Sequence, residues 1–416
     1  MVSLIFIGIG DSNGLWPHLF ETVLIEYAST TLTLMGGVLV VSLLFGVASA
    51  WIITNFNFPF KKALDLILIL PAACPAYLVA YAYTDFFEYA GPVQGALREV
   101  MGWTNASDYY FPEIRSLGGA IFVLSSVLYP YIYLLTRTSF RQTPQSLSDV
   151  SNIYGRSKFW NVSLPLARPA IFAGSALVCM EVVSDFGTVE FFSLNTLTLG
   201  IFNVWIGMNN ITAAAQISLF TFLFVLVLAI TEIKSRAGQR FHDTSQRQIN
   251  TFAKQAKPLS SILFVLICLI PIFCGFILPI SILLSNISTY LILEDLAIII
   301  TIIKNTFLVA ILGSILIISL ATLLTCAPSI LGSKFLVSLA NLSAYGYAFP
   351  GTMLAIGVLV TVGIVDKSFE YAFSSKFITL EPFFLSGTIS VLIFAYIVRF
   401  LAVGYGSTLS GLSKIS

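Results

Sequence analysis

Long apolar runs dominate this sequence and restrict what it can fold into. Nine such runs carry few charged side chains, and the charges gather in the stretches between them. A helix that rises about 1.5 Å per residue needs about 20 residues to cross the hydrocarbon core of a membrane. We therefore predict nine membrane-spanning helices, at residues 28–54, 63–88, 116–138, 168–190, 211–233, 258–284, 296–326, 335–364 and 384–404.

The composition supports a membrane protein built from helices. Charged residues make up 10% of the chain and hydrophobic residues 57%, whereas soluble domains have about 25% charged residues. The apolar runs are continuous and lack the alternation of inward and outward side chains that barrel strands show. The expected fold class is an all-α, polytopic transmembrane helical bundle in contact with membrane lipid.

The distribution of basic residues predicts the orientation in the membrane. Lys and Arg are enriched in cytoplasmic loops. Placing the 137–168 loop in the cytoplasm fixes every other loop by alternation, and it puts sixteen of the 21 Lys and Arg residues on the cytoplasmic side. The same alternation predicts a cytoplasmic C-terminus.

A polar, basic stretch at 234–257 divides the chain into two predicted halves, 1–233 and 258–416. Thr31 and Pro75 of the first half have counterparts at Thr306 and Pro350, both displaced by the same 275 positions. Pro and Gly breaks in matching helices are tolerated where other helices or a cavity satisfy the backbone, and this often indicates a transport pathway. The alternative is that these prolines are simple kinks.

The 137–168 loop contains the most informative motif. Asp149-Val150-Ser151 is followed by Gly155 and then by Leu164-Pro165, where the chain returns to the membrane. This order resembles the EAA signature of ABC importer permeases, which docks the ATPase. Two features depart from that signature: Asp149 stands where Glu is usual, and the stretch from Gly155 to Pro165 is three residues shorter.

The resemblance extends beyond the loop. The stretches EVVSDFGTVEFF (181–192) and NTLTLGIFNVWIGMNN (195–210) are similar to iron(III)-import permeases. The resemblance implies the type I (MetI-like) permease fold with two repeated halves, a dimer of ATP-binding cassette subunits and a periplasmic substrate-binding protein as partners. Against that family the chain is expected to be truncated at both ends, with its second half incomplete. Related permeases for thiamine, phosphonates, sulfate or polyamines share parts of this pattern.

Acidic residues inside a predicted span indicate a possible substrate pathway. Glu181 and Asp185 are four residues apart and share a helix face, with Thr188 following them. An ionised carboxylate within a membrane is expensive unless it is partnered or faces water. These residues could offer oxygen ligands to a hard cation, or they could be structural, bonded to neighbouring helices.

The sequence also restricts the activity. It contains no G-x-x-x-x-G-K-[ST], HExxH or GxSxG motif, so we predict a permease rather than an enzyme, with ATP hydrolysis on a separate subunit. No cofactor, resident metal or nucleic-acid partner is expected. The alternatives are an ion-coupled secondary transporter, which would carry charged pairs on several spans, and a membrane remnant that does not transport.

Overall fold

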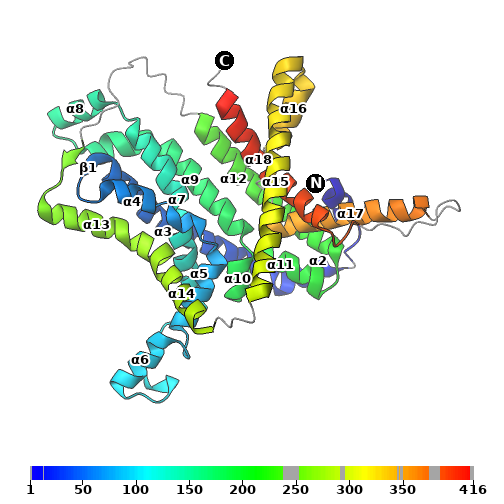
Figure 1. The fold of residues 1–416 in the computed structure, drawn as a ribbon, viewed down its shortest axis with the longest axis horizontal. Coiled ribbons are helices and arrows are strands. Elements are labelled where there is room, and N and C mark those ends of the chain that lie inside the picture. The colour runs from blue at the N-terminus through cyan, green and yellow to red at the C-terminus, as the bar shows by residue number, and fades with distance from the viewer. Residues whose placement is uncertain are drawn as a thin grey trace. The chain divides into compact units, whose positions relative to one another are not determined.

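The computed structural model describes residues 2–12, 14–237, 253–290, 296–343, 346, 350–373 and 385–412. These residues are mostly helical, and the strands among them are β1 (Phe56–Asn57) and β2 (Lys254–Gln255), which pair in parallel (Figure 1). The predicted all-α class is therefore confirmed.

The chain forms two compact units. The larger unit contains Thr22–Leu199 and Leu226–Tyr290, and the smaller unit contains Met1–Glu21, Gly200–Val225 and Leu291–Ser416. Each unit thus combines segments that are separated in sequence. The predicted domain boundaries at 233 and 258 stay a prediction.

The larger unit is built around three long helices, with shorter helices between and after them. Its helices are α3 (Leu24–Asn55), α4 (Lys61–Ile67), η1 (Leu70–Ala73), α5 (Ala76–Phe87), α6 (Pro92–Met101), η2 (Ala106–Asp108), α7 (Leu117–Arg141), α8 (Gln145–Ile153), the π-helix η3 (Phe159–Ser163), α9 (Leu164–Ser184), α10 (Gly187–Phe191), α13 (Pro258–Ile272), the π-helix η5 (Phe273–Ile277) and α14 (Leu278–Tyr290).

The smaller unit holds the beginning and the end of the chain. Its helices are α1 (Val2–Gly8), α2 (Leu15–Thr22), the π-helix η4 (Asn203–Gly207), α15 (Leu296–Leu331), α16 (Lys334–Ser343), α17 (Gly351–Phe373) and α18 (Ile389–Leu412). Two helices, α11 (Leu197–Phe202) and α12 (Ile211–Ala237), run along the chain from one unit into the other.

The core of the larger unit lies where α3, α7 and α9 pack together. Ser116 precedes α7 and caps it, because its hydroxyl accepts the backbone N–H of Gly119 at 3.2 Å. Its inward residues Val123, Leu124 and Ile132 are almost completely buried. Close helix contact through small residues is typical of membrane bundles, in which lipid offers no hydrophobic drive for association.

Seven helices among the described residues are long and apolar enough to cross a membrane, and a bent pair raises the number to eight. They agree with the predicted spans at 28–54, 116–138, 258–284, 296–326 and 384–404. The predicted span 211–233 lies within α12. The predicted span 168–190 ends early, at Ser184, because Asp185 takes an extended backbone conformation.

Two predicted spans were wrong as single helices. Residues 63–88 are broken at Cys74–Pro75, and the helices Lys61–Ala73 and Ala76–Met101 meet at 90°. Pro disfavours helical geometry in the residue before it, and Cys74 is extended. Residues 335–364 contain the end of α16 at Ser343 and the start of α17 at Gly351, directly after Pro350. The first break thus falls at Pro75, and α17 begins directly after Pro350, the proline that the repeat aligned with it; residues 347–349 before Pro350 lie outside the described residues.

Candidate functional site

The motif-bearing loop of the larger unit is an ordered helix–turn–helix segment. Helix α7 ends at Arg141, and α8 then carries Asp149, Val150 and Ser151. In Figure 1, α8 lies at the margin of this unit, away from the packed parts of α7 and α9. Asp149 and Val150 are exposed, whereas Ser151 is buried.

Gly155 forms the turn after α8. Its φ of +61° lies in the left-handed region, and a Cβ added there would meet no atom within 4 Å. The glycine is therefore required by backbone conformation and not by close packing. Ser151 Oγ reaches across this turn and donates to the carbonyl of Arg156 at 3.0 Å.

The loop carries one partly buried lysine and several exposed apolar side chains. Burial lowers the pKa of the Lys158 ammonium, while the nearby Asp149 carboxylate acts in the opposite direction. Several apolar side chains of α8 and the turn after it are exposed, among them Val150 (49% exposed), Ile153 (81%) and Tyr154 (76%). An apolar face outside the membrane-spanning part of a helix is typical of an interaction surface.

Leu164 and Pro165 lie in the first turn of α9, and both are half-buried. The π-helix Phe159–Ser163 runs directly into this turn. A proline inside a helix removes one hydrogen bond and crowds the carbonyl four residues earlier, and a wider π-helical turn relieves such crowding. The loop therefore re-enters the helical core without a break.

Asp185 and Thr188, two of the predicted pathway residues, are bonded to each other. The Asp185 carboxylate accepts the backbone N–H of Thr188 at 3.0 Å, its hydroxyl at 3.0 Å and the backbone N–H of Val189 at 3.1 Å. These are the first N–H groups of α10, which lack partners inside the helix. Asp185 thus caps α10, and Thr188 is fully buried.

Glu181 is half-buried and lies one turn before Asp185 on α9. Like Asp185, it makes interactions within the protein. Among the described residues, no group of three or more His, Cys, Asp or Glu side chains is placed to hold a metal ion. The three predicted residues lie on the last turn of α9, directly after it and at the start of α10, and together they supply two carboxylates and a hydroxyl.

The turn between α9 and α10 packs against the break in the second predicted span. A Cβ on Gly187 would stand 3.2 Å from Cβ of Tyr77, in the first turn of α5 after Pro75. The rings of Tyr81 and Phe191 lie 6.2 Å apart on the same two helices. Two interruptions of membrane helices, separated by more than a hundred residues in sequence, thus meet here. The sequence indicated each break but not their contact.

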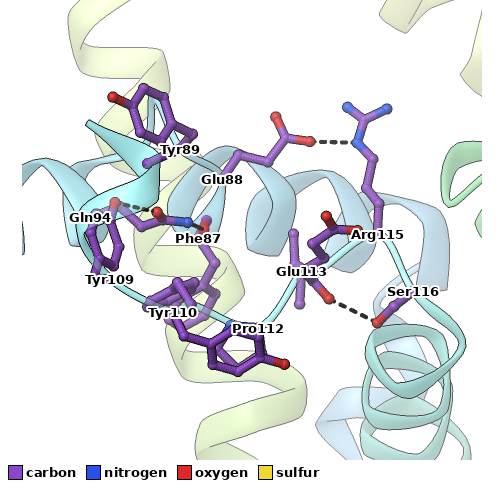
Figure 2. Close-up of a pocket in the computed structure, with 13 residues that line it drawn as sticks. Phe87, Glu88, Tyr89, Gln94, Tyr109, Tyr110, Pro112, Glu113, Arg115 and Ser116 are labelled. Carbon is purple, nitrogen blue, oxygen red and sulfur yellow. Dashed lines mark hydrogen bonds and ion pairs between the residues drawn. The ribbon is translucent and has the colours of Figure 1, made fainter.

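A second feature, which the sequence did not indicate, is a hollow of about 840 Å³ between α5 and α7, on the segment predicted to face outward. Figure 2 shows Tyr109 beside Gln94 and Glu88 reaching to Arg115. Tyr109 donates to Gln94 Oε1 at 2.6 Å, and Glu88 pairs with Arg115 at 2.5 Å. The polar side chains of the hollow are therefore bonded mostly to one another.

Comparison with known proteins gives one family. Residues 42–236 match the model of the binding-protein-dependent transport system inner membrane component. This match includes the loop, the broken span and the turn around Asp185. The helical architecture is consistent with the MetI-like fold of such permeases.

Individual relatives transport different solutes according to their names. The chain is 22% identical over 231 residues to the Fe(3+)-transport system permease protein FbpB 2 of Haemophilus influenzae, covering 55% of this chain and 41% of that protein. It is 22% identical over 188 residues to a probable sulfate transport system permease protein of Marchantia polymorpha, covering 43% and 62%. It is 26% identical over 211 residues to a putative 2-aminoethylphosphonate transport system permease protein of Salmonella paratyphi A, covering 49% and 71%.

Proposed function

Over residues 42–236 this chain belongs to the inner-membrane permease family of ABC importers, and from that premise we propose that it forms the substrate pathway of an ATP-driven importer. In this proposal a pair of ATP-binding cassette subunits hydrolyses ATP in the cytoplasm. A periplasmic binding protein delivers the substrate on the other side. The permease moves the substrate by changing conformation and does no chemistry itself.

The observation that carries this proposal is the ordered loop between α7 and α9. It combines the Asp149–Ser151 motif, a left-handed turn at Gly155 and exposed apolar side chains on α8. Such a surface fits an ATPase that presents an apolar groove to a short helix. The Pro165 turn anchors the loop in the helical core, so a force on α8 would reach the membrane helices.

We place the substrate pathway along the turn at Asp185 and Thr188, beside the break at Pro75. Interrupted helices at membrane depth are found where protein or a water-filled cavity satisfies the backbone. Glu181 and Asp185 supply the charged oxygen atoms there. The alternative of an ion-coupled transporter is less well supported, because these carboxylates lie on one turn.

Ferric iron is the substrate that we propose. Carboxylate and hydroxyl oxygens suit a hard cation, and one relative is named as an Fe(3+)-transport permease. Sulfate and 2-aminoethylphosphonate are named for other relatives, and thiamine and polyamines are further alternatives. We propose a multi-pass location in the inner membrane with a cytoplasmic C-terminus.

The test is uptake into vesicles that contain the permease, its ATPase and its binding protein. We expect ATP-dependent accumulation of radioactive ferric iron, and a loss of uptake in the double variant Glu181→Gln and Asp185→Asn. Both changes keep the side-chain volume and remove the charge. Glu99→Gln, at an exposed residue of α6, is the matched control.

The outcomes separate the alternatives. ATP-dependent uptake of sulfate or a phosphonate in place of iron would correct the substrate and retain the importer. Iron uptake that the double variant leaves unchanged would remove Glu181 and Asp185 from the pathway. Correct insertion without ATP-dependent uptake of any of these solutes would favour the remnant that does not transport.

A further inference from the structure

One face of α7 is bonded to α4 and to Leu68, the residue that follows α4, by four side chains in a row. Tyr129, Tyr133, Arg137 and Arg141 are spaced four residues apart in sequence. Residues with this spacing follow one another along a helix face. Each of the four bonds to the segment that leads into the break at Pro75, and we refer to the four side chains as the ladder.

Three of the four ladder side chains bond to one carboxylate. Tyr129 donates to the carbonyl of Leu68 at 2.8 Å, and Tyr133 donates to Asp65 Oδ1 at 2.5 Å. Arg137 and Arg141 both donate to Asp65 Oδ2, Arg141 at 2.9 Å. Asp65 thus accepts three side-chain donors from three successive turns of α7.

Burial makes this carboxylate difficult to replace. The side chain of Asp65 is 16% exposed and that of Arg137 is 20% exposed, whereas Arg141 is 47% exposed. A partly buried guanidinium needs an acceptor, and Nε of Arg137 is buried without one. Loss of Asp65 would therefore leave Arg137 as a partly buried charge without its main partner. The exposed Arg141 bond is the weaker one, because water competes for it.

The ladder lies between the two parts of the proposed importer that must communicate. Beyond Arg141 the chain continues within a few residues into α8, the proposed ATPase contact. Beyond Asp65 the chain continues through η1 to the break at Pro75, against which the Asp185 turn packs. A ladder that fixes α4 to the end of α7 would make these two parts move together.

We propose that Asp65 is a positioning residue for transport: it locks α4 and η1 to the end of α7, so that a displacement of α8 by the ATPase moves the break at Pro75. This inference rests on the proposed function. Asp65 contacts neither the ATPase nor the substrate in this account. Its effect on transport is exerted through Arg137, Arg141 and Tyr133.

The experiment compares the wild-type permease with Asp65→Asn, Asp65→Glu and Arg141→Gln, each assembled with the ATPase and binding protein in vesicles. The readouts are substrate uptake per ATP hydrolysed, ATPase co-purification, and deuterium exchange of residues 61–73. Asp65→Asn should lower uptake per ATP by about tenfold, the factor that corresponds to one lost charged hydrogen bond. ATPase co-purification should stay at the wild-type level, and exchange across 61–73 should accelerate.

The companion variants separate positioning from general damage. Asp65→Glu keeps the charge and should restore most of the lost uptake. Arg141→Gln removes only the exposed bond and should give a smaller loss in the same direction, which remains measurable if Asp65→Asn does not fold. Glu99→Gln should change none of the readouts.

Each contrary result has a distinct meaning. If Asp65→Asn exchanges like the wild type, or exchanges faster and still transports at the wild-type ratio, the positioning role is overturned while the importer stands. If the wild-type assembly shows no ATP-dependent uptake, the proposed function fails, and the role of Asp65 in transport fails with it.

Discussion

Gly174 of α9 lies against the backbone of Ile132 in α7, so that a Cβ on Gly174 would stand 2.8 Å from Ile132 Cα. On the other side of the same residue, a Cβ on Gly46 of α3 would stand 2.9 Å from Ile132 Cβ. Ile132 is fully buried between the two glycines. The contact of the three long helices therefore depends on the absence of side chains at both positions.

The first prediction follows from this contact. Gly46→Ala and Gly174→Ala should each lower the thermal stability of the purified permease, because overpacking a helix contact costs about 1–3 kcal/mol. Gly36→Ala, on the same helix α3 as Gly46, is the matched control, since a Cβ there would meet nothing within 4 Å. An equal change in melting temperature for Gly36→Ala and Gly46→Ala would contradict the close contact.

The second prediction concerns the turn in the loop. Gly155→Ala should weaken binding of the ATPase, because a side chain in the left-handed region costs about 1–2 kcal/mol and would shift the turn. Gly155→Asn should be milder, since Asn tolerates this conformation better. Crosslinking of the loop to the ATPase subunit measures the effect. A Cβ on Gly155 would meet no atom within 4 Å, so a weaker binding of the ATPase by Gly155→Ala would not come from a clash inside the permease.

The third prediction separates two roles of Asp185. Asp185→Ala removes every acceptor for the first N–H groups of α10 and should destabilise the protein by about 1 kcal/mol, as the loss of a helix cap does. Asp185→Asn keeps one acceptor oxygen and should lose less stability. Thermal unfolding of both variants gives the comparison. Equal stability of Asp185→Ala and the wild type would contradict the capping role.

The sequence predicted this fold well where hydrophobic length alone decides the structure. The apolar runs that became α3, α7, α15 and the continuous stretch of α13, η5 and α14 are long enough to admit one interpretation. Prediction was poorer at Pro75 and Pro350, where a run of sufficient length is interrupted by local backbone chemistry. Both prolines were recognised as breaks, yet length favoured a continuous span. The 90° bend depends on tertiary packing, which a single run does not specify.

The sequence identified the residues of the candidate site but not the contacts that they make. The spacing of Glu181 and Asp185 suggested one helix face, whereas the helix ends at Ser184 and Asp185 turns to cap the next helix. The signal for this was the Asp-Phe-Gly sequence itself, because Asp and Gly together favour a turn. Asp65 was missed because it stands near the start of the predicted span 63–88, close to Lys61 and Lys62, where a charged residue at a membrane boundary is ordinary. Its partners lie 68 to 76 residues away in sequence.

The fourth prediction concerns pH and the outward hollow. Asp108 accepts the backbone N–H groups of Asn105 and Thr104, and these bonds hold the pKa of its carboxyl below the ordinary value. A lowered pKa in the folded state means that the stabilisation is complete above the unfolded pKa and is lost as pH falls through the folded pKa. After correction for the intrinsic exchange rate, the protection of residues 103–109 against deuterium exchange should therefore fall as the pH drops below about 4, the ordinary pKa of an Asp carboxyl. Asp108→Asn should remove this pH dependence.

The fifth prediction tests the surface of α8 directly. Ile153 is 81% exposed, and burying its apolar side chain against a partner would be favourable. If it inserts into the ATPase, Ile153→Ser forfeits about 1.5–3 kcal/mol of apolar burial, which corresponds to a loss of affinity of about tenfold or more. Co-purification of the ATPase with the permease measures this loss.

The control for Ile153 is Tyr110, which is 90% exposed and lies on the segment predicted to face outward. Tyr110→Ser removes a comparable apolar surface from the other side of the membrane and should leave ATPase binding unchanged. Since both side chains are exposed, neither substitution should alter the thermal stability of the permease itself. ATPase binding that survives Ile153→Ser and falls with Tyr110→Ser would reverse the predicted orientation. Binding that survives both would show that α8 is not the contact.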